Sequence, residues 1–214
     1  FNKEEGYFDI SKAFYFRGLS KFDLDMFSSS INDFSESILL NDNFPQSYFN
    51  RGNAKYYMND YEGAIDDFNM SIKIDDKYIE AYWMRATLND QLKNFDQVLN
   101  DYDKVIELNP NFYEAYIYRG NLKSSLYDFI GAIEDFSTVI NFQPERSIAY
   151  FNRGYNKINL KDTIGALNDY DIALDLVNEE DWLISIISLE KAKILISLNQ
   201  EFEAIPYLNN AIKN

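Results

Sequence analysis

Residues 48–68 read YFNRGNAKYYMNDYEGAIDDF, and the same arrangement of aromatic, small and acidic residues returns every 34 residues along the chain. A small residue recurs at Gly18, Gly52, Ala86, Gly120 and Gly154. An aromatic residue precedes each by four positions, at Phe14, Tyr48, Tyr82, Tyr116 and Tyr150. A second small or slim residue and a second aromatic follow in register, at Ser30, Ala64, Val98, Ala132, Ala166 and at Phe34, Phe68, Tyr102, Phe136, Tyr170. A fixed period of this length indicates a repeat protein.

Each repeat unit predicts two helices. In the second unit, residues spaced by four and three along one helical face are Tyr48, Gly52 and Lys55. After a short break comes an apolar stripe with the same spacing, formed by Tyr61, Ala64, Ile65, Phe68 and Ile72. This periodicity is typical of an amphipathic helix. A short polar residue precedes the second helix of four units, at Asp60, Asn94, Asp128 and Asp162. Such residues are predicted to cap the free N–H groups of the first helical turn.

The pattern in residues 48–68 resembles the tetratricopeptide repeat, and the likeness extends over residues 11–214. The resemblance implies an all-α fold, a right-handed α-solenoid (superhelix) of six stacked antiparallel helix pairs. We place the repeats after an N-terminal extension at residues 1–10, at 11–44, 45–78, 79–112, 113–146, 147–184 and 185–214. Four extra residues around Val177–Asp181 are predicted to lengthen a helix or loop in the fifth unit. The sixth unit has Leu208 in place of its aromatic, and its outer apolar face is predicted to be uncapped.

An arginine and an aspartate recur together in the first five units. The arginines directly precede the small residue of the first helix, at Arg17, Arg51, Arg85, Arg119 and Arg153. The aspartates directly precede the aromatic of the second helix, at Asp33, Asp67, Asp101, Asp135 and Asp169. The sixth unit has Lys191 and Tyr207 at these two places. We predict structural Arg–Asp pairs between helices, because a guanidinium meets a carboxylate with two parallel hydrogen bonds. A ladder of arginines that binds ligand anions is the weaker alternative.

The resemblance implies a concave surface built mainly from the first helices. The residues predicted to line a peptide-binding groove there are Tyr15, Phe49, Asn53, Glu80, Trp83, Glu114, Ile117, Asn121, Phe151 and Tyr155. Aromatic side chains anchor partners with little entropic cost, and the asparagines can hydrogen-bond a peptide main chain. The alternative is that the aromatics only pack between neighbouring helices. A clamp for a peptide carboxylate is not expected, because Glu80, Glu114 and Ile148 stand where the family's clamp has cations.

Composition excludes several other classes of function. The chain has no histidine and no cysteine, so the Ser-His-Asp and Cys-His catalytic groups cannot form. No calcium-loop spacing, phosphate-binding loop or apolar run long enough to span a membrane occurs, and we predict no metal and no cofactor. The net charge of -15 would repel nucleic acid. A neutral or basic partner is compatible with it.

The sequence therefore predicts a non-catalytic scaffold that binds a protein or peptide in its concave groove. One alternative is a structural module that self-associates, as a homodimer, through its uncapped C-terminal edge. Another is that the chain is the scaffold portion of a larger enzyme or receptor. The sequence specifies neither the partner nor the cellular compartment.

Overall fold

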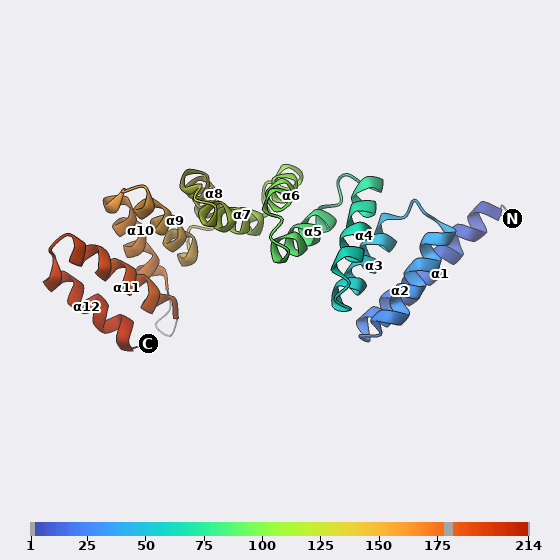
Figure 1. The fold of residues 1–214 in the computed structure, drawn as a ribbon, viewed down its shortest axis with the longest axis horizontal. Helices are drawn as coiled ribbons and strands as arrows, with labels where there is room; N and C mark the ends of the chain where they lie inside the picture. Colours follow the sequence, from blue (N-terminus) through green and yellow to red (C-terminus); the bar gives the residue numbers. More distant parts are fainter. Residues whose placement is uncertain (1–2, 178–181, 214) are drawn as a thin grey trace. The chain divides into compact units, whose positions relative to one another are not determined.

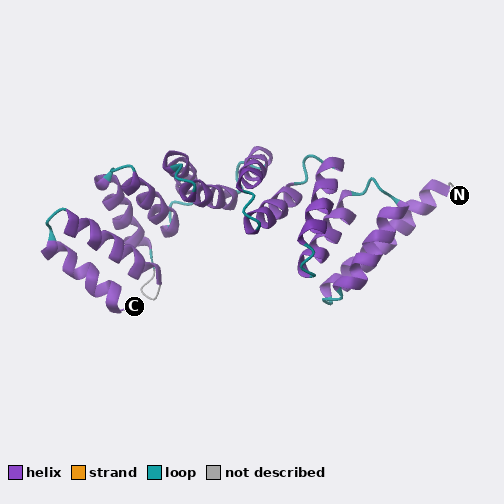
Figure 2. Ribbon diagram, viewed as in Figure 1, coloured by secondary structure: helices purple, strands orange, loops and turns teal. Residues whose placement is uncertain are grey.

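The computed structural model of the protein describes residues 3–177 and 182–213. Within these ranges the secondary structure is helical, with no strand (Figure 2). The chain divides into two compact parts, Phe1–Asn109 and Pro110–Asn214, and each is described by itself.

Each part contains six of the described helices. The N-terminal part has α1 (Lys3–Asp23), α2 (Phe27–Leu40), α3 (Pro45–Tyr57), α4 (Tyr61–Ile74), α5 (Ile79–Gln91) and α6 (Phe95–Leu108). The C-terminal part has α7 (Tyr113–Ser125), α8 (Phe129–Phe142), α9 (Ser147–Asn159), α10 (Thr163–Leu176), α11 (Trp182–Ser197) and α12 (Glu201–Lys213). Consecutive helices pack as antiparallel pairs, and within each part every pair also contacts the next (Figure 1). The predicted all-α array of helix pairs is confirmed.

The helix ends refine the expected boundaries. α1 begins at Lys3, so the described residues of the proposed N-terminal extension continue the first helix of the first pair. Pro110 and Pro144 both follow the end of a second helix, as predicted. α10 ends at Leu176 and α11 begins at Trp182; the extra residues predicted around Val177–Asp181 lie, except for Val177, outside the described residues.

Three of the four predicted N-caps are confirmed. The carboxylates of Asp60, Asp128 and Asp162 each accept a hydrogen bond from a glycine N–H three residues later, at 2.9–3.1 Å. Asn94 occupies the same position before α6, but its side chain makes no capping bond. Its amide instead donates to Asn89 Oδ1 at 2.9 Å. The prediction was wrong for Asn94, because the N–H of Gln97 donates to the backbone carbonyl of Asn94, at 3.0 Å, and not to its side-chain oxygen.

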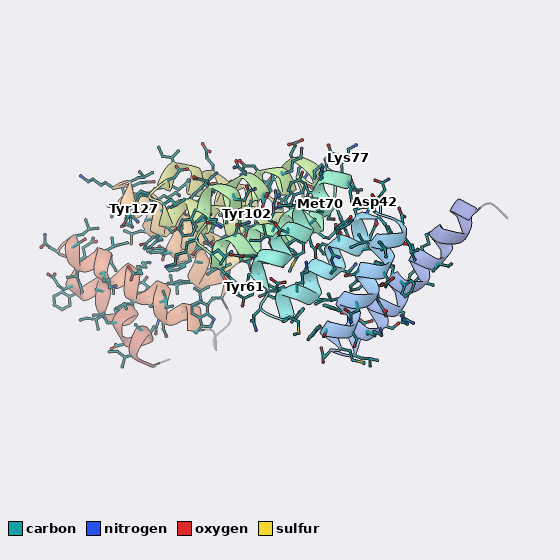
Figure 3. All side chains as sticks on the ribbon, turned by 45° about the vertical axis from the view of Figure 1, so that its right-hand side comes forward. Asp42, Tyr61, Met70, Lys77, Tyr102 and Tyr127 are labelled. Atoms are coloured by element: carbon teal, nitrogen blue, oxygen red, sulfur yellow. The ribbon has the colours of Figure 1, made fainter. Side chains whose placement is uncertain are left out.

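The turn inside each pair contains one residue with a positive φ, and none of these residues is glycine. They occupy equivalent places, at Asp25, Asn59, Lys93, Tyr127, Lys161 and Asn199. Tyr127 is labelled in Figure 3. The next residue's N–H closes the turn by donating to a carbonyl five residues earlier, as Asp162 does to Lys157 at 2.9 Å. Glycine is the usual residue at this helix-ending position, because a Cβ makes the left-handed conformation unfavourable.

Replacing Lys161, which has a φ of 65°, with glycine is therefore expected to stabilise the protein. The free energy of unfolding should rise by about 1 kcal/mol, the strain that a side chain adds in this conformation. Chemical denaturation followed by circular dichroism measures the change. Asn199→Gly is the matched control and should gain less, because asparagine tolerates the left-handed region. A loss of stability in Lys161→Gly would contradict the expectation.

The small residues of the first helices let the second-helix aromatics approach closely. Phe68 is fully buried, and a Cβ added at Gly52 would lie 2.8 Å from its ring. Gly154 stands in the same relation to Tyr170, with a separation of 2.6 Å. A side chain at either glycine would overlap the ring, so this pairing sets the distance between the two helices.

The predicted Arg–Asp pairs form in all five pairs of helices. Each guanidinium donates from Nε to Oδ2 of its aspartate at 2.8–3.0 Å. It also donates from Nη2 to Oδ1 at 2.5–2.7 Å. The five aspartates are buried. Each arginine also lies over the aromatic residue three positions before it, with 5.1–5.6 Å between the guanidinium carbon and the ring centroid. Each arginine therefore links the two helices of its pair.

A lysine that the sequence analysis did not assign to these pairs joins four of them. It donates to the same aspartate at 2.7–3.0 Å, at Lys21, Lys55, Lys123 and Lys157. The third pair has Asn89 at this place, and Asp101 receives instead a hydrogen bond from Gln97 at 2.9 Å. Asp101 therefore depends on one cation where the other four aspartates have two. In the first pair, the hydrogen bond from Arg17 holds the pKa of Asp33 below its usual value.

Three arginines also connect a pair to the one before it. Arg51 and Arg153 donate from Nη1 to a serine hydroxyl on the preceding second helix, at 3.1 and 3.2 Å. Arg85 donates to Asn69 Oδ1 at 2.5 Å. The same side chain therefore closes its own pair and joins it to its neighbour.

The sixth pair replaces the ion pair with a different contact. Lys191 Nζ donates to the Tyr207 hydroxyl at 2.8 Å and also bonds to Asp171 of α10. Burial alone would lower the pKa of Lys191, but the hydrogen bonds to Asp171 and Tyr207 raise it above its usual value. The two residues that depart from the repeat pattern thus still link α11 to α12.

Candidate functional site

Two aromatics predicted to line the groove in the N-terminal part take part in packing. Tyr15 and Phe49 are half-buried. The ring centroid of Tyr15 lies 4.9 Å from that of Phe44, the N-cap residue of α3. The ring centroid of Phe49 lies 5.0 Å from that of Tyr78, the N-cap residue of α5. Burial raises the pKa of Tyr15. The alternative reading, packing between neighbouring helix pairs, accounts for the contacts of both rings.

The remaining predicted residues of this part differ in exposure. Trp83 is half-buried against Tyr102, with 5.6 Å between ring centroids. Glu80 is exposed in the first turn of α5. Asn53 is half-buried, and its Oδ1 is buried without a hydrogen-bond partner. These side chains do not converge on a described cavity.

The C-terminal part has a cavity of about 370 Å³ on its three first helices, α7, α9 and α11. We call it the α9 pocket. Its lining consists of Asn121, Ser124, Phe151, Asn152, Tyr155, Asn156, Ile186 and Glu190. Asparagine amides and apolar side chains are therefore mixed on its wall, which is typical of sites that orient a ligand by a few polar contacts.

Three predicted site residues, Asn121, Phe151 and Tyr155, lie together in the α9 pocket. Asn121 and Tyr155 are exposed, and Phe151 is half-buried. The other two predicted residues of this part are not among its lining residues. Ile117 packs against the apolar core of α8 to α11, and Glu114 is half-buried in the first turn of α7.

Asn156 is the most unusual residue of the α9 pocket. It is only 1% exposed, and its Nδ2 donates to the carbonyl of Asn152 at 2.8 Å. Because a carbonyl can only accept, this bond identifies the other amide atom as Oδ1. That oxygen is buried with no hydrogen-bond partner. Leaving a buried acceptor unpaired costs about 1–3 kcal/mol, so the position of Asn156 Oδ1 is an unfavourable one unless a donor reaches it.

The other polar groups of the α9 pocket include acceptors as well as donors. Asn152 donates its amide to Asn121 Oδ1 at 3.1 Å, which leaves its own oxygen as an acceptor. The Glu190 side chain is 31% exposed and accepts a hydrogen bond from Lys193 at 2.6 Å. A carboxylate has lone pairs for further donors. The unpaired oxygen of Asn156 and the carboxylate of Glu190 therefore favour a ligand group that donates hydrogen bonds and carries positive charge.

Sequence reasoning did not assign Asn156, Ile186 or Glu190 to the site. A signal for Asn156 exists, because the equivalent positions of three earlier first helices are the buried apolar residues Ala54, Leu88 and Leu122. No comparable signal exists for Ile186 and Glu190. They lie beyond the four-residue insertion, where the 34-residue register no longer applies.

The described residues contain no group of three or more aspartates or glutamates placed to hold a metal ion. No helix in the described ranges is both long and apolar enough to cross a bilayer.

Comparison with known proteins identifies the repeat. Residues 45–78 and 79–112 each match the tetratricopeptide repeat family. No curated protein sequence matches the chain. YrrB, whose crystal structure is described as that of a TPR protein with an unusual peptide-binding site, is 19% identical with a TM-score of 0.73. That match covers 90% of this chain and 94% of YrrB.

Two further solved structures share the fold. A tetratricopeptide repeat protein from Parabacteroides merdae ATCC 43184 is 16% identical, with a TM-score of 0.74, over 96% of this chain and 80% of that one. MamA 41-end from Desulfovibrio magneticus RS-1 is 17% identical, with a TM-score of 0.69, over 81% and 98%. At these identities the likeness concerns the fold alone. The two family matches in direct succession identify residues 45–112 as tetratricopeptide repeats.

Proposed function

We propose that this protein is a non-catalytic scaffold that binds a peptide or protein partner through the face formed by its first helices. The observation that carries the proposal is the α9 pocket, where Asn121, Phe151 and Tyr155 from the predicted face lie around one cavity. Its mixed apolar and amide lining suits a peptide, whose main chain needs hydrogen bonds and whose side chains need apolar contact. The peptide-binding site named for YrrB is consistent with this use of the fold.

The charge of the protein supports a neutral to basic partner. The net charge is -15, and Glu190 lies at the α9 pocket. An acidic partner would be repelled over the whole approach, whereas a basic one would be attracted and would bind faster.

An array of short synthetic peptides, probed with the purified protein, tests the proposal. A subset of peptides should bind, and Tyr155→Ala should weaken that binding by removing an exposed aromatic contact. The matched control is Tyr127→Ala, which removes a tyrosine that is 81% exposed and does not line the α9 pocket. The proposal fails if no peptide binds the wild type, or if both variants bind as the wild type does.

A second candidate function is self-association through α12, which presents three exposed apolar side chains. Phe202 is 90% exposed, Ile205 49% and Ile212 82%. Leu208 is less suitable for a test, because it packs against the small core formed with α11. Light scattering should show a dimer that Phe202→Glu dissociates. A wild-type protein that stays monomeric at high concentration would exclude this candidate.

A further inference from the structure

We propose that the α9 pocket binds the guanidinium group of an arginine side chain in the partner, with Asn156 Oδ1 and the Glu190 carboxylate as its acceptors. This inference rests on the proposed function, since the arginine is taken to belong to the bound peptide. It adds the chemistry by which that peptide is recognised.

The first support is the unpaired oxygen of Asn156. The same helical position holds alanine or leucine in three other pairs, so the fold does not require an amide there. Asn156 is nonetheless 1% exposed, with Oδ1 unpaired, at the wall of a cavity. A ligand that donates to Oδ1 would remove the cost of the unpaired acceptor, and that gain would appear as affinity.

The second support is the charge and shape of the rest of the α9 pocket. Glu190 supplies a carboxylate, so a cationic donor is favoured over an anion. Tyr155 and Phe151 add aromatic faces, on which a planar guanidinium can stack. Guanidinium is also more weakly hydrated than ammonium, so it enters a partly buried site at lower cost.

Access to Asn156 Oδ1 requires a small rearrangement. The oxygen is closed to solvent in the unliganded protein, so neighbouring side chains must rotate before a donor can reach it. The neighbouring Tyr155 is 47% exposed, which leaves its side chain room to turn. Rotamer changes of this kind are common when interfaces form.

The test compares matched peptides on four proteins. Peptides that bind the wild type are remade with each arginine replaced by lysine or by citrulline, which keeps the shape of arginine but carries no charge. Fluorescence anisotropy should show the citrulline and lysine peptides binding about tenfold more weakly, as expected for losing a hydrogen bond between charged groups. Glu190→Gln and Asn156→Leu should each lose this preference. Glu134→Gln, an exposed change on α8, should keep it.

The stability of the variants separates recognition from a structural role. Asn156→Leu should raise the midpoint of thermal unfolding, because it removes an unpaired buried oxygen, and should still lose the preference for arginine. If Asn156 and Glu190 were only structural, the ratio of arginine to citrulline affinity would be unchanged in both variants. That result, or equal affinity of the wild type for arginine and lysine peptides, would overturn the inference while leaving the proposed function standing. If no peptide binds at all, the proposed function itself fails.

Discussion

Arg85→Ala is expected to lower the free energy of unfolding by about 3–5 kcal/mol, the range measured when one partner of a buried ion pair is removed. Asp101 is 1% exposed, and Arg85 is the one cation that its contacts in the described structure provide. After the substitution, the carboxylate would keep a hydrogen bond from Gln97 but no opposite charge. Urea denaturation followed by circular dichroism measures the loss.

The same change at Arg51 provides the comparison. Asp67 also bonds Lys55 at 2.8 Å, so Arg51→Ala leaves its carboxylate paired with a cation. We therefore expect Arg51→Ala to be the milder variant, although it too loses a contact to the preceding helix pair. Adding Asp101→Asn to Arg85→Ala should recover part of the loss, because a neutral amide needs no counter-charge. Equal losses for Arg85→Ala and Arg51→Ala would show that the second cation does not compensate.

Gly154→Ala is expected to destabilise the protein by about 1–2 kcal/mol, because the cost of overpacking exceeds the helix-forming advantage of alanine. The new Cβ would lie 2.6 Å from the Tyr170 ring and 3.2 Å from the carbonyl oxygen of Ala166. Tyr170 is 1% exposed, so its ring has little room to move. Thermal unfolding of the variant and the wild type gives the difference.

Gly120→Ala is the matched control for this prediction. Its Cβ would lie 3.1 Å from the nearest atom of Phe136, a contact that a small shift relieves. The third pair already has a buried alanine, Ala86, at the equivalent position. We expect the stability of Gly120→Ala to stay close to that of the wild type. If Gly154→Ala were as stable as Gly120→Ala, the close approach of the Tyr170 ring would not explain why glycine occupies position 154.

The fold and the ion pairs could be predicted from the sequence because each repeats in register. Arg119 and Asp135, for example, have counterparts in four other units, and co-occurrence at a constant spacing of 16 residues is enough to pair them. Lys123 recurs almost as regularly, one turn after the arginine on the same helical face. A long lysine side chain at that place can reach the partner helix or extend into solvent, and the sequence does not distinguish the two. Spacing along one helix does not say which of its residues reaches the partner helix.

The candidate site was less predictable, and the aromatic row shows why. Phe49 and Phe151 occupy equivalent positions in their units. Phe49 packs against Tyr78, the N-cap residue of the next first helix, α5. Phe151 stacks on Tyr170, as Phe49 packs on Phe68, and it also lines the α9 pocket. The sequence of a unit specifies the face on which a side chain lies, but the next unit decides whether that side chain meets another ring or a cavity.

The sequence by itself determined the helix pairs, the close contacts of small and aromatic residues, and the Arg–Asp pairs. All three follow from local periodicity, which acts within one unit and is repeated along the chain. Only the tertiary structure decided that Asn156 is buried with an unpaired oxygen and that Glu190 lies at the same cavity. Glu190 lies on α11, after the insertion that breaks the period, and the surroundings of a buried side chain are a property of the neighbours that pack around it.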